Sequence, residues 1–194
     1  MSDLVRSEQD SLGRLDVPVS ALWGIQTERA RRTFAISGLR PLPGFVDAVV
    51  RIKRAAALTH AALGTLDPRL ADAIVRAADE VLSGEHRDQF VVDPYQAGAG
   101  TSHHMNVNEV LANRANELLG TPRGSYAPVH PNDHVNQAQS TNDVIPTAIR
   151  LAILLAFPSF DASAAALEEA FAERGRAFDD VIKAGRTHLQ DAMP

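Results

Sequence analysis

The spacing of apolar residues along the chain predicts a protein built mainly from helices. An alternating stretch at 14–19 is typical of a short strand, and Pro18 restricts that strand to a sheet edge or a strand end. Beyond it, apolar residues recur at the three- and four-residue spacing of an amphipathic helix. This pattern predicts helices over 45–63, 68–83 and 107–119, separated by turns that contain glycine or proline.

The helix over 68–83 has the clearest start and stop signals. Asp67 is the predicted N-cap, Pro68 suits the first helical position, and Gly84 follows the last turn. The apolar residues between these signals fall on one face of a helix: Leu70, Ile74, Ala77 and Val81.

The last part of the chain predicts two further helices, one on each side of Pro158. The first covers 143–157 with Pro146 in its first turn, and Pro158 then ends or kinks it. The second runs from about 161 to 184. Its apolar face consists of Leu167, Ala170, Phe171, Phe178, Val181 and Ile182. Because one helix cannot bury such a face by itself, we expect it to join a bundle and to be exposed when its partners are absent.

The composition is typical of a soluble globular protein. The chain has 194 residues and a formal net charge of −5, which argues against a nucleic-acid-binding surface. The absence of cysteine excludes a disulfide framework, a thiol nucleophile and a cysteine zinc site. No apolar run approaches the roughly 18 residues that span a bilayer, and the first ten residues lack a signal-peptide core. We therefore expect a cytoplasmic protein that does not associate with membranes or nucleic acid.

A glycine-rich segment at 98–102 is the first candidate site. Its glycines allow close approach of a ligand to the backbone, and Thr101 and Ser102 add hydroxyl groups. The start of the following helix supplies free N–H groups, so the combination suits a small anion. The alternative is an ordinary turn in which Thr101 or Ser102 serves as the N-cap.

A second polar segment covers 129–143 and ends in Ser140, Thr141 and Asn142, directly before a predicted helix. One of these three should cap the helix. Three capping-type residues in a row exceed that need, so they indicate a row of neutral hydrogen-bond donors for a carboxylate.

Two histidines in the same segment, His130 and His134, have a spacing that could bind a metal on a helix. Pro131 and the Asn-Asp pair after it favour a loop instead, so no metal site is predicted. A third polar cluster at 185–191 contains Thr187 and His188, for which structural and functional roles both stay open.

These clusters, in this order and spacing, resemble the signature motifs of the aspartase/fumarase superfamily. The resemblance rests on Gly-Ala-Gly-Thr-Ser at 98–102 with Met-Asn-Val-Asn-Glu at 105–109, on Pro-Asn-Asp-His at 131–134 with Gln-Ser-Thr-Asn-Asp at 139–143, and on Gly-Arg-Thr-His-Leu-Gln-Asp at 185–191. It covers the chain from about Asp10 onward.

The resemblance implies a mainly α, L-aspartase-like fold. Residues 1–139 would form an N-terminal helical domain, and 140–194 would begin a central helical bundle with its first long helix. Members of the superfamily are homotetramers in which three subunits build each active site. The family's serine base loop lies beyond position 194, so we expect this chain to be an N-terminal part that is inactive by itself.

Within the superfamily the motifs are most similar to those of aspartate ammonia-lyases, which eliminate ammonia from L-aspartate to give fumarate. Ala99 and Thr141 favour this branch, because class II fumarases usually have serine at both positions. The segments 107–115 and 129–133 are also close to fumarases. A malate/fumarate hydratase and an inactive helical remnant therefore remain as alternatives.

The resemblance also implies a role for each motif residue. Thr101, Ser140 and Thr141 would hold the carboxylate that becomes a dianion during proton removal. Asn142 and His188, with Thr101, would surround the leaving amino group, His188 as the catalytic residue, and Thr187 would bind the other carboxylate. A secondary dicarboxylate site would include His130, Asn132 and Asp133. Neither a metal nor an organic cofactor is expected, and His103 and His104 are expected to be exposed or packing residues.

Overall fold

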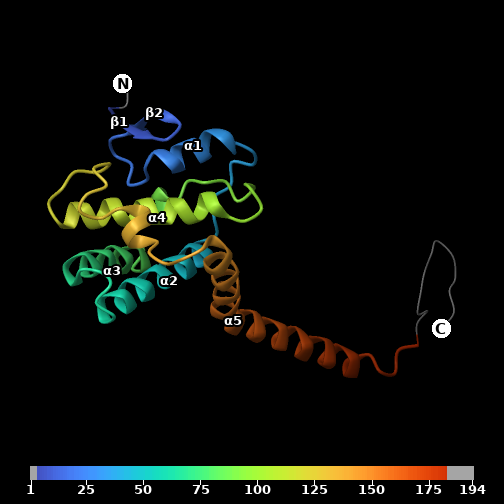
Figure 1. Cartoon of the computed structure of the whole chain (residues 1–194). Coiled ribbons are helices and arrows are strands. Elements are labelled where there is room, and N and C mark those ends of the chain that lie inside the picture. Colours follow the sequence, from blue (N-terminus) through green and yellow to red (C-terminus); the bar gives the residue numbers. More distant parts are fainter. Residues whose placement is uncertain (1–3, 183–194) are drawn as a thin grey trace. The chain divides into compact units, whose positions relative to one another are not determined.

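The computed structural model describes residues 4–182 and confirms the mainly helical fold (Figure 1). The elements are β1 (Val5–Asp10), β2 (Gly13–Pro18), α1 (Ile25–Thr33), α2 (Pro43–Ala62), α3 (Pro68–Leu82), the 3-10 turn η1 (Arg87–Gln89), α4 (Thr101–Leu118), the π-helical turn η2 (Pro131–Val135) and α5 (Thr141–Ala177). The contacts divide the chain into two units, Met1–Ile153 and Leu154–Pro194, a division that falls later than the expected boundary after residue 139.

The predicted strand at 14–19 is present as β2, and Pro18 is its last residue. Its antiparallel partner β1 was missed. The sequence of β1 carries no apolar alternation, because its inward position is occupied by Glu8, whose carboxylate is buried and hydrogen-bonded to the N–H of Ile25 at 2.8 Å.

Helices α2 and α3 form an antiparallel pair close to the predicted bounds. The carboxylate of Asp67 caps α3 by accepting a hydrogen bond from the N–H of Arg69 at 2.7 Å, as expected. On the predicted face, Ile74, Ala77 and Val81 are fully buried. The predicted helices over 45–63 and 68–83 are therefore confirmed.

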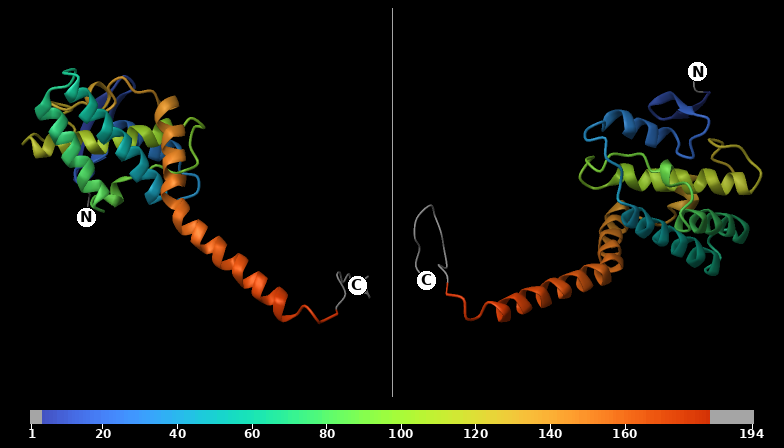
Figure 2. Two further views of the ribbon diagram at one scale, coloured as in Figure 1. Left: turned by 90° about the horizontal axis from the view of Figure 1, so that it is seen from below. Right: turned by 180° about the vertical axis from the view of Figure 1, so that it is seen from behind.

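Helix α4 lies at the centre of the first unit. The hairpin and α1 lie on one side of it, and α2 and α3 lie on the other, an arrangement that the view from behind also shows (Figures 1 and 2). The helix begins at Thr101, earlier than the predicted 107, because its first turns carry polar residues and histidines instead of an apolar stripe. Its apolar residues Val107, Val110 and Leu111 are fully buried in the core.

Helix α4 also has a buried polar face. Four of its side chains recur at helical spacing and are 0–1% exposed: Asn106, Glu109, Asn113 and Asn116. Each binds the backbone of a neighbouring loop instead of another side chain. Asn106 pairs with Val91 and Gln89, Asn113 with Leu22 and Gly124, and Asn116 with both backbone groups of Val129.

Of these four side chains, Glu109 makes the most hydrogen bonds to the backbone. It accepts hydrogen bonds from the N–H groups of Gly24, Gln26 and Thr27 at 2.9–3.0 Å, and so caps α1 from a different helix. Glycine at position 24 allows this close approach, because a β-carbon would crowd the hydroxyl of Tyr126 and lie 2.8 Å from Oε1 of Glu109. Burial raises the pKa of Glu109, while these N–H donors oppose that shift.

The prediction of two helices in the last part of the chain was wrong, because a single helix, α5, is present there. It continues through Pro158 and ends at Ala177, whereas two helices were expected with the second reaching about 184. Proline removes one backbone hydrogen bond from a helix, and here the surrounding residues are exposed, so water can satisfy the freed carbonyl. Phe178 and Val181 therefore lie beyond the helix end.

The two ends of α5 differ in burial. Val144, Ile145 and Ala148 in the first turns are buried in the core of the first unit. The expected apolar face farther along is exposed, with Leu167 at 58% and Phe171 at 69%. By length and mean hydropathy alone, α5 is also long and apolar enough to cross a membrane, although helices in the cores of soluble proteins meet the same criterion.

Replacing Glu109 tests the role of the polar face of α4. Glu109→Ala leaves two buried N–H groups and a third, partly buried one without acceptors, so we expect the free energy of unfolding to fall by about 3 kcal/mol in urea denaturation. Glu117→Ala, which removes a partly exposed carboxylate from the same helix, should cost clearly less. Equal losses for the two variants would contradict this role.

Candidate functional site

The N-termini of α4 and α5 lie next to each other in the first unit. Gly100 precedes α4 with φ of 74°, and a β-carbon on it would lie 3.2 Å from the side chain of Ile145 in α5. Behind them, Nδ1 of His104 lies 2.8 Å from the hydroxyl oxygen of Thr141. The structure thus places the start of α4 close to the start of α5, through contacts made by Gly100 and His104. The carboxylate site expected at Thr101, Ser140, Thr141 and Asn142 stays a prediction.

The two helices differ in which residue caps them. Gly100 is the N-cap of α4, so neither Thr101 nor Ser102 has that position, and the side chain of Gln96 accepts from the N–H of His103 at 2.9 Å. For α5, one of the residues 140–142 was expected to act as the cap. Ser140 has this role, because its hydroxyl accepts a hydrogen bond from the N–H of Asn142 at 3.1 Å.

The remaining polar groups at this junction are free to bind a ligand. Thr101, Ser140 and Asn142 are exposed and Thr141 is partly exposed. Within residues 4–182, the N–H groups of Thr101, Ser102 and Thr141 have no hydrogen-bond acceptor. Two helix N-termini with adjacent hydroxyls offer neutral donors and positive dipole ends, which suits a carboxylate.

A buried polar chain lies behind Thr141, and the sequence analysis missed it. Lys53 in α2 is fully buried, and its ammonium nitrogen contacts Nε2 of His104, Oδ1 of Asn136 and Oε1 of Gln139 at 2.5, 2.7 and 2.9 Å. Burial lowers the pKa of Lys53 to about 7 and, together with the Lys53 charge, lowers the pKa of His104 to about 3.

A signal for Lys53 was present in the sequence. It falls on the apolar face of its own helix, in register with Val46, Val50 and Ala57, all of which are buried. A lysine at such a position is rarely buried without a specific polar partner. His104 was expected to be exposed or packing, and the structure gives it two hydrogen-bonding neighbours.

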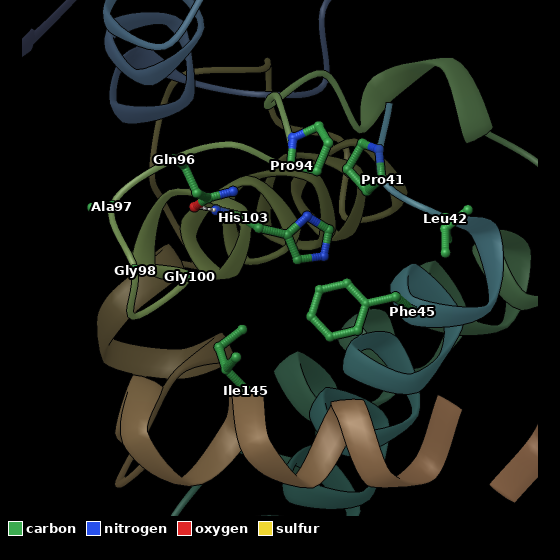
Figure 3. A pocket seen from close by; sticks show the side chains of 10 residues that line it. All are labelled: Pro41, Leu42, Phe45, Pro94, Gln96, Ala97, Gly98, Gly100, His103 and Ile145. Carbon is green, nitrogen blue, oxygen red and sulfur yellow. Dashed lines mark hydrogen bonds between the residues drawn. The ribbon is translucent and has the colours of Figure 1, made fainter. Parts of the chain in front are cut away.

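A mainly apolar cavity of about 290 Å³ adjoins the same junction (Figure 3). Phe45 from α2 and His103 from α4 line it with their rings stacked on each other, centroids 4.9 Å apart, and Ile145 of α5 also lines it. His103 is 2% exposed, and among residues 4–182 neither of its ring nitrogens has a hydrogen-bond partner. Burial lowers its pKa to about 4, so the ring is neutral at pH 7.

The residues of the expected secondary site lie at η2, where the sequence analysis expected a loop. His130 and Asn132 line a cavity of about 170 Å³ next to Tyr126, whereas Asp133 is exposed. Nδ1 of His134 accepts a hydrogen bond from the N–H of His130 at 2.8 Å, so this nitrogen already has a partner in the protein.

Among residues 4–182, one group has the composition and spacing for a metal ion: Glu80, Glu85 and His86. The guanidinium of Arg114 takes both oxygens of Glu80, at 2.5 and 2.8 Å, so this group is an ion-pair cluster. Thr187 and His188 lie outside the described residues, and their expected roles stay predictions.

A comparison with protein families matches residues 13–194 to the model of a family described as lyase. Class II fumarate hydratase from Halobacterium salinarum is 54% identical over the whole chain, which covers 41% of that relative. Aspartate ammonia-lyase from a Bacillus species is 46% identical, again over the whole chain and 42% of the relative. The chain therefore spans about two fifths of the length of these relatives.

Solved structures of related lyases are also similar to this chain, again over part of their own length. A fumarate lyase:delta crystallin from Brucella melitensis matches with a TM-score of 0.87 and 50% identity, over 97% of this chain and 44% of that one. A class II fumarase from Schistosoma mansoni matches with a TM-score of 0.82 and 40% identity, over 97% of this chain and 40% of that one.

The adjacent histidines of α4 should respond in opposite ways to the same substitution. His103→Leu removes two unpartnered nitrogens, so we expect the free energy of unfolding to rise by about 1 kcal/mol. His104→Leu removes one of the three acceptors of Lys53 and the partner of Thr141, so it should lower the free energy of unfolding by about 2 kcal/mol. Urea denaturation at pH 7, followed by circular dichroism, measures the two differences.

The pH dependence of stability tests whether burial lowers the pKa of His103. Its pKa is about 4 in the folded chain and about 6.5 when unfolded, so the unfolded chain binds the proton more tightly between these values. Stability should therefore fall as the pH drops from 6.5 to 4, and His103→Leu should reduce that fall by on the order of 3 kcal/mol. An unchanged slope would show that His103 does not titrate as its burial implies.

Proposed function

We propose a function from one premise: the chain belongs to the lyase family, in the aspartase/fumarase superfamily. The proposal is that it carries part of an active site that forms and consumes fumarate, and that the reaction is the reversible hydration of fumarate to malate. The carrying observation is the junction of α4 and α5, where Gly100 lies against Ile145 and His104 contacts Thr141, so that two helix N-termini lie close together.

The chemistry of fumarate formation needs such a junction. A base removes a proton from the carbon next to a carboxylate, and the negative charge moves into that carboxylate. Preorganised neutral donors stabilise the resulting dianion and need no rearrangement at the moment of reaction. Thr101, Ser140 and Thr141 would supply hydroxyl donors, and the free N–H groups of the two helices would add to them.

We favour fumarate hydration over aspartate deamination because the chain is more similar in sequence to class II fumarate hydratases. The class II fumarate hydratases compared with this chain reach 54% identity, against 46% for the aspartate ammonia-lyase. Both branches act through the same kind of carboxylate stabilisation, so the junction itself supports either one.

Aspartate deamination is the second candidate, and it rests on Ala99 and Thr141. These are the motif positions at which the chain resembles aspartate ammonia-lyases and where class II fumarases usually carry serine. Thr141 also contacts His104, so its hydroxyl has a defined environment.

A side-by-side assay separates the two candidates. The protein at the full length that its gene encodes should hydrate fumarate with a kcat/KM at least ~100-fold above its aspartate deamination, measured by the ultraviolet absorbance of fumarate. A reversed ratio would assign the protein to the ammonia-lyases. Absence of both activities would contradict the proposed function.

Removal of one hydroxyl donor tests the junction directly. Thr141→Ala should lower kcat/KM by roughly 10-fold or more, as expected when one donor to a developing negative charge is lost. Thr147→Ala, at an exposed position on the same helix, provides the matched control and should leave kcat/KM unchanged. Equal effects of the two substitutions would remove Thr141 from the proposed site.

We also propose that the exposed apolar face of α5 forms the bundle of a homotetramer, in line with the family resemblance. Leu167 and Phe171 lie one turn apart on this face and are 58% and 69% exposed. An apolar face of this length is typical of a protein–protein interface.

Charge substitutions on α5 test this assembly. We expect Leu167→Lys with Phe171→Lys to weaken self-association by at least ~10-fold in sedimentation velocity, because two charges would be buried in the bundle. Ala165→Lys with Glu169→Lys places the same residues on the other side of the helix and should have little effect. A monomeric wild-type protein, or equal effects of the two pairs, would contradict the bundle.

A further inference from the structure

The ammonium group of Lys53 is bound by three neutral acceptors and by no carboxylate. Within residues 4–182 it takes part in no ion pair, and its neighbours are Nε2 of His104 and the side-chain oxygens of Asn136 and Gln139. An ammonium has three N–H donors and no lone pair, so three acceptors satisfy it fully. The protonated form of Lys53 therefore fits this cage without an unpaired atom.

This arrangement determines which nitrogen of His104 carries hydrogen. Because the ammonium can only donate, Nε2 of His104 must accept, and the hydrogen of the neutral ring then lies on Nδ1. Nδ1 is the atom that contacts the hydroxyl oxygen of Thr141 at 2.8 Å, so His104 donates and Thr141 accepts. The hydroxyl hydrogen of Thr141 is then left for another acceptor.

The opposite ring tautomer would have the opposite effect. With hydrogen on Nε2, Nδ1 would accept the hydroxyl hydrogen of Thr141, and Thr141 would have no donor left for a ligand. Lys53 thus selects between two states of a hydroxyl that it does not touch. His103 offers a contrast within the same helix, since in the described part of the chain its two nitrogens have no partner that could fix a tautomer.

We propose that Lys53 is a positioning residue: through His104, it fixes the hydroxyl of Thr141 as a hydrogen-bond donor toward the substrate carboxylate at the α4–α5 junction. This inference rests on the proposed function for the identity of the acceptor. With Lys53 protonated, the contacts give the direction of the hydrogen bonds in the chain Lys53, His104 and Thr141. Asn136 and Gln139, as neutral amides, add no further titratable group around the ammonium.

The tautomer of His104 can be measured without any activity. In the 194-residue chain labelled with ¹⁵N-histidine, long-range ¹H–¹⁵N spectra at about pH 6 should show His104 neutral with hydrogen on Nδ1, since this pH lies below the pKa of Lys53. Hydrogen on Nε2, or on both nitrogens, would overturn the proposal. His104→Leu assigns the signal by its disappearance, and the wild-type spectrum decides the matter even if a Lys53 variant fails to fold.

A double-mutant cycle then tests the link to the reaction. In the protein at its full encoded length, Lys53→Met should lower kcat by roughly 10-fold while KM changes less than about 3-fold, and Thr141→Ala should have a similar effect. The double variant should be no slower than either single variant, because both remove the same donor. His104→Asn, which keeps an N–H donor near the Nδ1 position, should retain most of kcat.

The outcomes of the cycle are distinguishable. Losses that multiply in the double variant would show that Lys53 acts on stability or packing and would overturn the positioning role. A protein with the expected His104 tautomer but with neither lyase activity would contradict the proposed function, and the substrate part of the inference with it. A protein that is active with hydrogen on Nε2 of His104 would contradict the inference alone.

Discussion

The first unit of this protein depends on one central helix, α4, which buries a polar face as well as an apolar one. Asn106, Glu109, Asn113 and Asn116 of α4 hydrogen-bond to backbone groups of the loops that surround the helix. Burial of backbone N–H and C=O groups without partners is costly, so loops can cross a core only where something satisfies them. Helix α4 supplies those partners, and the loops can therefore lie against it instead of against water.

The candidate site follows from the same arrangement. Because the loops around α4 are held, its N-terminus is fixed at Thr101, and the glycine before it allows α5 to begin within contact distance. The second layer of the site is also polar and buried, with Lys53 and His104 behind Thr141. A ligand-binding hydroxyl backed by a fully satisfied polar chain has a defined direction, which is what preorganised stabilisation of charge needs.

The sequence predicted those features that local rules control. The cap at Asp67, the stripe on α3 and the order of the helices all follow from patterns within one element, and the motif spacing identified the superfamily. It did not predict features set by distant partners. Strand β1 has an inward Glu8 because Tyr126 and Ile25 lie there, α5 passes through Pro158 because that turn is exposed, and Lys53 lies in a core because His104 and two amides come from elsewhere in the chain.

The polar face of α4 also bears on how the chain reaches its native state. Its hydrogen bonds to the segment at 22–27 join residues that are 82 to 91 positions apart. Its hydrogen bonds to Gly124 and Val129 form only after these residues, which follow the helix in the chain, have been synthesised. During synthesis, α4 can form as a helix early, but the partners of its polar face are complete only when the chain has reached residue 129. Long loops must then close before these contacts stabilise anything, so this helical unit has the non-local contact pattern that slows folding.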